Sequence, residues 1–266
     1  MHYLLMQNRA GRNAMENLPP KFDKIIPYEL AGFFGRSKLQ KFWRTTRTSY
    51  VLYPLIRLFP KATRQEHVIC DAGCGPGIVD LFFARRGFKI KGIDILKPFI
   101  TFARQMFEKK RLPGTFLVAD ITTQSPVFDE NGCDAVICID AIEHFKDPAK
   151  AINNFKKILG NHGHVLLTTP NFGNPLFSII ERLWDIVGRT PGWKTMHITR
   201  LGLQEYRNLF TNAGFHLEQS GTFFLVSPIV GIFSPRLARF ASRFEREILA
   251  RFPIGLMLFL HASIVD

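Results

Sequence analysis

Short apolar runs alternate with stretches of helical periodicity from residue 66 to the end of the chain. Runs of four to ten residues, bounded by Gly, Pro or Asp, predict strands, whereas apolar residues at i, i+3 and i+4 predict helices. The predicted strands are 68–71, 88–94, 115–119, 134–139, 164–169, 215–224 and 256–265, and the clearest predicted helices are 78–85, 149–159 and 203–213. Such alternation is typical of an α/β fold built on a largely parallel sheet.

The first strand runs into a glycine-rich turn, Asp71-Ala72-Gly73-Cys74-Gly75-Pro76-Gly77. Glycine allows a sharp turn and a close approach to a ligand, because it has no Cβ. A dinucleotide site needs its third glycine three positions after the second, where the pyrophosphate meets a helix N-terminus, but Ile78 occupies that position here. The carboxylate of Asp71 would also repel a pyrophosphate and attract a cation. S-adenosylmethionine (SAM), which carries an ammonium and a sulfonium, therefore fits better.

Two further strands also end in an acid. Asp94 closes the second strand, 23 residues after Asp71, where a carboxylate can accept both hydroxyls of a ribose. Asp120 follows the third strand and is placed to meet an adenine amino group. Three successive strands that end in Asp, in register with the glycine-rich turn, together indicate a SAM site.

These motifs resemble those of the class I SAM-dependent methyltransferases over residues 66–220. The resemblance implies a Rossmann-like α/β fold: a seven-stranded sheet with helices on both faces and an N-terminal helical cap. It also implies methyl transfer as the activity and SAM as the cofactor. The cofactor-binding positions that it implies are Asp71, Gly73, Cys74, Gly75, Gly77, Asp94, Ile95, Asp120, Ile121, Ile139 and Asp140.

The segment after the fourth strand, Glu143-His144-Phe145-Lys146-Asp147-Pro148, resembles that of the ubiquinone-pathway O-methyltransferases, which methylate polyprenyl catechols. In that group the positions of Asp140, Glu143 and His144 are implicated in binding a divalent metal. The usual Glu is replaced by the shorter Asp140 here, so we expect no metal. We expect Glu143, His144 and His197 to be catalytic, the two histidines being alternative bases. The other interpretation is that Asp140 faces the cofactor while Glu143 and His144 only orient the loop.

The composition indicates a folded, basic protein. Of 266 residues, 46% are hydrophobic, 26 are Phe, and the net charge is +13, which favours nucleic acid, a phospholipid surface or an acidic metabolite as partner. Cys70, Cys74, Cys133 and Cys138 form no CxxC pair and predict buried thiols in a reducing, cytoplasmic compartment. We expect no signal peptide, and the longest apolar stretches, 222–233 and 253–265, are too short to span a bilayer.

The domain organisation predicted from these patterns is a basic helical cap, 1–65, followed by a methyltransferase domain, 66–266, with insertions at 172–200 and 226–252. Residues 1–66 contain twelve Lys or Arg residues against four acids. The cap is either a helix packed on the core with a solvated basic face, or a lid over the active site that also meets an anionic surface.

The second insertion predicts a basic amphipathic helix over 236–251. Its apolar positions, on one face, are Leu237, Phe240, Phe244 and Ile248, and its basic positions are Arg236, Arg239, Arg243 and Arg246. Such a helix either contacts an anionic membrane surface peripherally or packs its apolar side against the domain.

The resulting functional hypothesis is methyl transfer from SAM to a small, apolar or lipid-like acceptor, most readily at oxygen. The alternatives are an RNA methyltransferase, suggested by the charge, and a non-catalytic SAM-binding assembly factor. Nucleic acid is the less favoured partner, because no RNA-binding module is recognisable and no Asn-Pro-Pro-Tyr-like segment follows the fourth strand. The sequence does not specify an oligomeric state.

Overall fold

The computed structural model describes residues 38–123, 128, 132–177, 179, 197–249, 252 and 254–264. The chain divides into two compact units, Met1–Asp120 and Ile121–Asp266, each of which is described by itself. Among the described helices, none has the length and apolar character needed to cross a bilayer.

The first unit contains three parallel strands. Its elements are α3 (Lys38–Leu58), η2 (Arg64–Glu66), β1 (Val68–Ala72), α4 (Asp80–Ala84), β2 (Lys89–Asp94), α5 (Lys97–Lys110) and β3 (Gly114–Val118). Val68 pairs with Lys89, and Ile90 pairs with Gly114. The three predicted strands are confirmed to within a residue at each end, because their apolar runs end at clear turn residues.

Helix α3 is joined to the start of β1 by Phe59 and Arg64. The Arg64 side chain donates to the carbonyl oxygens of Phe59 (2.9 Å) and Ile56 (3.2 Å), and the Phe59 ring lies 4.2 Å from that of His67. Arg44 is only 7% exposed, so the basic side of this helix is not wholly solvated, contrary to one of the two interpretations. Residues 1–37 of the predicted cap lie outside the described part of the chain, and the lid remains a prediction.

The second unit contains four strands, of which β4 and β5 are parallel and β7 is antiparallel to both β5 and β6. Its elements are β4 (Cys133–Ile139), η3 (Ile142–His144), α6 (Pro148–Ile158), β5 (Leu159–Pro170), α9 (Leu203–Asn212), β6 (His216–Phe223), α10 (Ser227–Phe233), α11 (Pro235–Leu249) and β7 (Met257–Ser263). Much of the first insertion, residues 178 and 180–196, lies outside the described residues.

The junction of α6 and β5 differs from the prediction at one end. Asp147 caps α6, accepting from the Lys150 backbone N–H at 2.9 Å. The helix ends at Ile158, one residue before the predicted end, because Leu159 already pairs with Cys133 as the first residue of β5. The register resumes where Ala135 pairs with His164, so residues 160–163 form a bulge that the apolar pattern did not mark.

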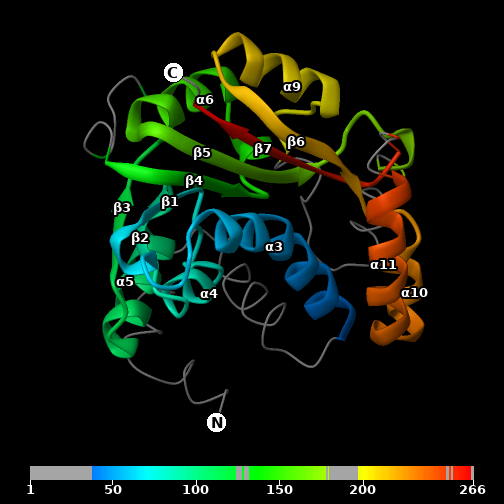
Figure 1. The fold of residues 1–266 in the computed structure, drawn as a ribbon, viewed down its shortest axis with the longest axis horizontal. Helices are drawn as coiled ribbons and strands as arrows, with labels where there is room; N and C mark the ends of the chain where they lie inside the picture. Colours follow the sequence, from blue (N-terminus) through cyan, green and yellow to red (C-terminus); the bar gives the residue numbers. More distant parts are fainter. Residues whose placement is uncertain are drawn as a thin grey trace. The chain divides into compact units, whose positions relative to one another are not determined.

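The strand order is β3-β2-β1-β4-β5-β7-β6, and the sheet is mixed because β7 is antiparallel to its neighbours. This order confirms the predicted α/β fold class. The second insertion folds as two helices, α10 and α11, which lie side by side and connect β6 to β7 along the chain (Figure 1). Sequence periodicity predicted only α11, because α10 is a short helix of seven residues that contains Pro228 and Gly231.

Candidate functional site

The glycine-rich turn after β1 requires its glycines for two reasons. Gly73, Gly75 and Gly77 all have positive φ (83°, 52° and 71°), a region that residues with a Cβ seldom adopt. A Cβ on Gly77 would also lie 2.9 Å from the Cβ of Ala103 in α5. The turn therefore follows a path that only this alternating pattern permits, and its backbone passes against α5.

Asp94 holds this turn in place. Its Oδ2 accepts from the Gly75 N–H at 2.9 Å, and its Oδ1 accepts from the Leu96 N–H at 2.8 Å. A carboxylate oxygen has two lone pairs and can accept more than one hydrogen bond. The next residue, Ile95, is 66% exposed and offers an apolar surface beside the acid. Asp120 stands two residues beyond the end of β3.

Two acids are buried under the same turn. Asp71 is 3% exposed and Asp80, the first residue of α4, is 0% exposed. Burial raises the pKa of Asp80 to about 7, and burial followed by repulsion from Asp80 raises the pKa of Asp71 well above its ordinary value. Two adjoining buried carboxyl groups share a proton more readily than they ionise together. A cation bound beside the pair would favour the ionised form of both carboxyl groups, so the pair suits a positively charged ligand.

The sequence did not single out Asp80. The only available signal was an acid at the start of a helix, which is common because the first turn of a helix favours negative charge. What makes this one unusual is its complete burial against a second carboxyl group, that of Asp71.

The four cysteines are free and buried, as predicted. Burial, followed by the negative charge of Asp80, raises the pKa of the Cys74 thiol well above its ordinary value. The thiol therefore stays protonated at neutral pH, and Cys74 contributes packing at the turn rather than a nucleophile.

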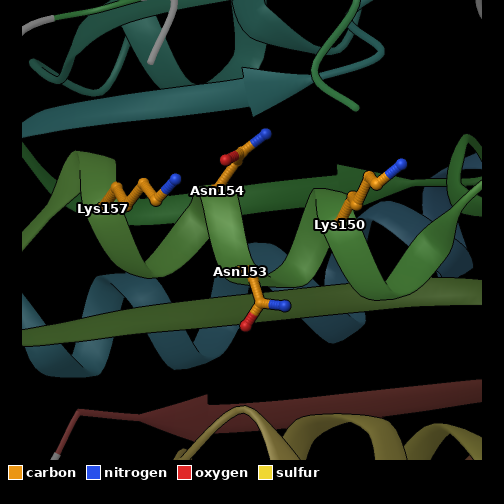
Figure 2. A pocket seen from close by; sticks show the side chains of 4 residues that line it. All are labelled: Lys150, Asn153, Asn154 and Lys157. Atoms are coloured by element: carbon orange, nitrogen blue, oxygen red, sulfur yellow. The ribbon is translucent and has the colours of Figure 1, made fainter. Parts of the chain in front are cut away.

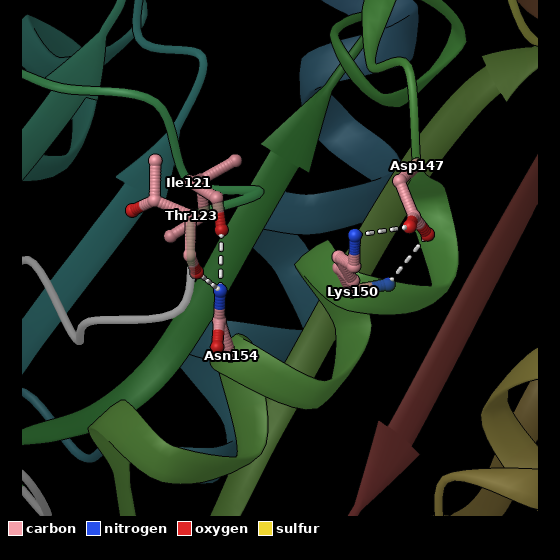
Figure 3. A network of polar contacts seen from close by, with 5 residues as sticks. All are labelled: Ile121, Thr123, Asp147, Lys150 and Asn154. Atoms are coloured by element: carbon pink, nitrogen blue, oxygen red, sulfur yellow. Dashed lines mark hydrogen bonds and ion pairs between the residues drawn. The ribbon is translucent and has the colours of Figure 1, made fainter.

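The second unit holds the chemistry-bearing residues that follow β4. Asp140, directly after Ile139, has φ of 51°, its N–H donates to the Thr168 carbonyl at 2.8 Å, and its Oδ1 accepts from the Thr168 hydroxyl at 3.5 Å. Asp tolerates this left-handed conformation better than most residues with a Cβ, and it turns the chain from β4 into η3. Ile121 is held from α6, where the buried Asn154 side chain donates to its carbonyl at 2.8 Å and also to the carbonyl of Thr123 (Figure 3).

Glu143, His144 and His197 form one cluster. Their carboxylate and imidazole ligand atoms all lie within 4.8 Å of one another, and the two histidine rings are stacked at 5.3 Å. Glu143 is 1% exposed, and its Oε2 accepts from the Thr169 hydroxyl at 2.9 Å. The loop that carries His197 is bound directly, because the Ile198 and Thr199 N–H groups both donate to the Glu143 carbonyl at 2.9 Å. Two histidines predicted as alternatives are therefore neighbours.

The geometry of this cluster is compatible with proton transfer or with metal binding. One ligand atom from each of the three residues lies within 4.8 Å of the others, and the two imidazole rings are stacked. Asp140 is not part of the group, and Glu143 already accepts from Thr169. The expectation of no metal remains a prediction, with these three residues as the ligands that a metal would use.

Aromatic side chains surround the cluster. The Phe172 ring lies 5.4 Å from that of His197 and 5.0 Å from that of Phe177, and the Arg200 guanidinium lies 4.3 Å above the Phe172 ring.

Tyr206 is fully buried. Burial, and next the Glu143 carboxylate, raise the pKa of its hydroxyl well above the ordinary value. Tyr206 therefore keeps its proton, and His144 is the most exposed member of the cluster. The sequence did not indicate Thr169, Phe172 or Tyr206, because nothing local distinguishes them from core residues.

A shallow hollow on the outer side of α6 lies apart from these residues. It encloses about 460 Å³ and is lined by Lys150, Asn153, Asn154 and Lys157 (Figure 2). None of the predicted site residues lines it, so it is not the acceptor site predicted after β4.

Comparisons with known proteins show which proteins the chain is similar to. Ubiquinone biosynthesis O-methyltransferases from Alkalilimnicola ehrlichii and Aliivibrio fischeri are 34% and 32% identical over 116 and 147 residues, which are 42% and 53% of this chain and 46% and 59% of those proteins. The chain thus spans about half the length of the curated relatives it matches. The predicted resemblance to that group is confirmed.

Solved structures share the fold at low identity. Magnesium protoporphyrin IX methyltransferase from Synechocystis PCC 6803 superposes with a TM-score of 0.60 at 14% identity, covering 95% of this chain and 100% of that one. A SAM-dependent methyltransferase from Aquifex aeolicus has a TM-score of 0.55 at 11% identity, covering 90% and 98%. A family model described as a methyltransferase domain matches residues 42–220. The chain therefore belongs to the methyltransferase domain family.

Proposed function

We propose that this chain is a SAM-dependent methyltransferase that methylates a hydroxyl oxygen of a small, apolar, lipid-like acceptor. The observation that carries the proposal is the Glu143–His144–His197 cluster, which provides a base in an aromatic setting directly after β4. The curated relatives support the acceptor class, since they are named for O-methylation in ubiquinone biosynthesis.

The first unit offers the residues that would hold SAM. The buried acids Asp71 and Asp80 suit its positive charge, Asp94 can accept from the ribose, and Ile95 and Asp120 suit the adenine. When bound, SAM supplies a methyl group activated by an adjacent sulfonium. The roles predicted for Ile121, Ile139 and Asp140, which belong to the second unit, remain predictions.

The second unit would remove the acceptor proton. His144 would accept the proton of the acceptor hydroxyl, which makes the acceptor oxygen a better nucleophile for the methyl group that bound SAM would supply. The buried Glu143 carboxylate stabilises the imidazolium that results, and His197 stacks on His144 and limits its orientation. General base catalysis of this kind contributes about 10²–10⁴-fold in rate.

The test is transfer of a labelled methyl group from SAM to a polyprenyl catechol, to the same catechol without its tail, and to total RNA. We expect label in the tailed catechol, a smaller signal without the tail, and none in RNA. His144→Gln should lower kcat about 10²–10⁴-fold with unchanged cofactor affinity. His216→Gln, which changes an exposed histidine of β6, is the matched control and should leave kcat unaltered.

Other outcomes of this assay would support the alternative functions. Label in RNA alone would favour the RNA methyltransferase, and cofactor binding without transfer to any acceptor would favour the assembly factor. We expect full activity in excess chelator. Loss of activity that a divalent ion restores would instead make Glu143, His144 and His197 a metal site.

A further inference from the structure

Helix α11 presents its apolar side chains outward. Leu237, Phe240 and Phe244 lie on one face and are 62%, 73% and 62% exposed. The residues turned inward are Ala238 and Glu245, at 0% and 6% exposure. The interpretation in which this stripe packs against the domain is therefore wrong for these three residues. The side chains of Arg246 and Ile248 lie outside the described part of the chain.

A buried carboxylate maintains this orientation. Glu245 Oε1 accepts from the Val226 and Ser227 N–H groups at 2.5 and 2.6 Å, and its Oε2 accepts from the Ser227 hydroxyl at 2.6 Å. These groups form the beginning of α10, where N–H groups lack helical partners and favour negative charge. Because Glu245 must face α10 to make these bonds, the stripe on the other side of α11 must face away.

Further exposed apolar side chains lie at the ends of the two helices. Phe233 at the end of α10 is 84% exposed, and Val226 before α10 is 50% exposed. After α11, Phe252 and Ile254 are 56% and 48% exposed. Single exposed apolar residues are ordinary, but so many large ones in one short segment mark an interaction surface.

The exposed charged side chains described on α11 are all positive, and the side chain of Glu247 lies outside the described part of the chain. Arg236, Arg239 and Arg243 are exposed on α11, and residues 227–244 contain no Asp or Glu. We name Leu237, Phe240 and Phe244 with these three arginines the α11 face. A second copy of the chain that covered the apolar stripe would place its own three arginines opposite these three. Repulsion between the like charges makes that contact unfavourable.

We propose that the α11 face docks the chain reversibly on an anionic phospholipid bilayer. The apolar side chains of an interfacial helix enter the boundary between headgroups and acyl chains, while its arginines meet anionic headgroups. The Leu237–Phe240–Phe244 stripe flanked by arginines has this arrangement, and the chain's net charge of +13 adds long-range attraction. The inference goes beyond methyl transfer, because docking needs neither cofactor nor acceptor.

The test is sedimentation of the full chain with phosphatidylcholine vesicles that contain none, about 20% or about 40% phosphatidylglycerol, compositions chosen to raise the surface potential. We expect binding that rises with anionic lipid. Phe240→Ser with Phe244→Ser, and separately Arg236, Arg239 and Arg243 changed to Gln, should each weaken it at least about tenfold. These side chains are exposed, so thermal unfolding should be little changed.

A matched control variant distinguishes binding by the α11 face from attraction due to the net charge of the chain. Lys89, Lys109 and Lys110 are exposed residues of the first unit, and changing all three to Gln removes the same charge elsewhere. This variant should bind anionic vesicles within about twofold of wild type, because general attraction is screened at physiological salt. An equal loss in both charge variants would overturn the assignment to α11.

Tryptophan fluorescence reports whether the α11 face enters the bilayer. In Phe240→Trp, the added indole should show a blue-shifted emission with anionic vesicles and none with neutral ones. Absence of both the shift and sedimentation would reject bilayer docking. So would RNA binding that depends on the three arginines without vesicle binding, or a dimer in size-exclusion chromatography that Phe240→Ser abolishes.

Discussion

The acid pair under the glycine-rich turn and the α11 face both reverse the usual distribution of polar and apolar groups. The first buries the carboxyl groups of Asp71 and Asp80, and the second exposes Phe240 and its neighbours. Each arrangement is unfavourable in the protein alone and becomes favourable with a partner, a cation in one case and an apolar surface in the other. The difference lies in how each is held, since backbone packing confines the acids whereas one carboxylate orients α11.

The largest effect that separates the two regions should come from Glu245→Ala. The change leaves the Val226 and Ser227 donors unsatisfied, so we expect a loss of about 3–5 kcal/mol in the free energy that holds α10 against α11. Hydrogen exchange should quicken in residues 227–249, and binding to vesicles should weaken. Glu108→Ala, an exposed site on α5, is the control and should change stability by less than about 0.5 kcal/mol.

The next effect is on cofactor binding in the first unit. Asp94→Ala removes both the acceptor for the Gly75 and Leu96 N–H groups and the predicted acceptor for the ribose. We expect a loss of about 2–3 kcal/mol in the affinity for S-adenosylhomocysteine, measured by calorimetry, with vesicle binding unchanged. Unaltered affinity would contradict the assignment of this acid to the cofactor.

A smaller and opposite effect is expected for Asp80→Asn. Because the pKa of Asp80 is raised to about 7, the folded state holds a proton that the unfolded state has lost, and stability falls as pH rises from about 4 to about 7. Asn cannot ionise, so the variant should be more stable than wild type by about 1–3 kcal/mol at pH 8 and nearly equal at pH 4. Denaturant unfolding at both pH values measures this, and equal stability at pH 8 would argue against a strained pair.

The smallest effect is expected for a buried histidine. Its contribution to stability rises with pH over the range in which that of Asp80 falls. Burial, and next the neighbouring His164, lower the pKa of His261 to about 4. Stability due to neutral His261 is present above about pH 6.5 and is lost as pH falls towards 4. His261→Gln should flatten this acid-side loss and leave the effect of Asp80→Asn intact, which separates the two contributions.

Local patterns were sufficient for the strands, the turn and several helix ends. The glycines at 73, 75 and 77 predicted a tight turn, because no other residue takes positive φ so readily, and the structure has that conformation at all three. The helix predicted over 149–159 begins within one residue of that range, because Asp147 caps it through a local bond and Pro148 suits its first turn. The apolar spacing in α11 likewise predicted a helix with a stripe.

Only the tertiary structure shows which parts of the chain these helices, strands and turns contact. Periodicity cannot say which side of α11 faces inward, since that depends on Glu245 reaching Val226 and Ser227 across the hairpin. The meeting of His144 with His197 depends on backbone bonds from Ile198 and Thr199 to Glu143, and the burial of Asp80 depends on packing around β1. Sequence patterns record interactions within a few residues, whereas burial and charge pairing arise between segments far apart in the chain.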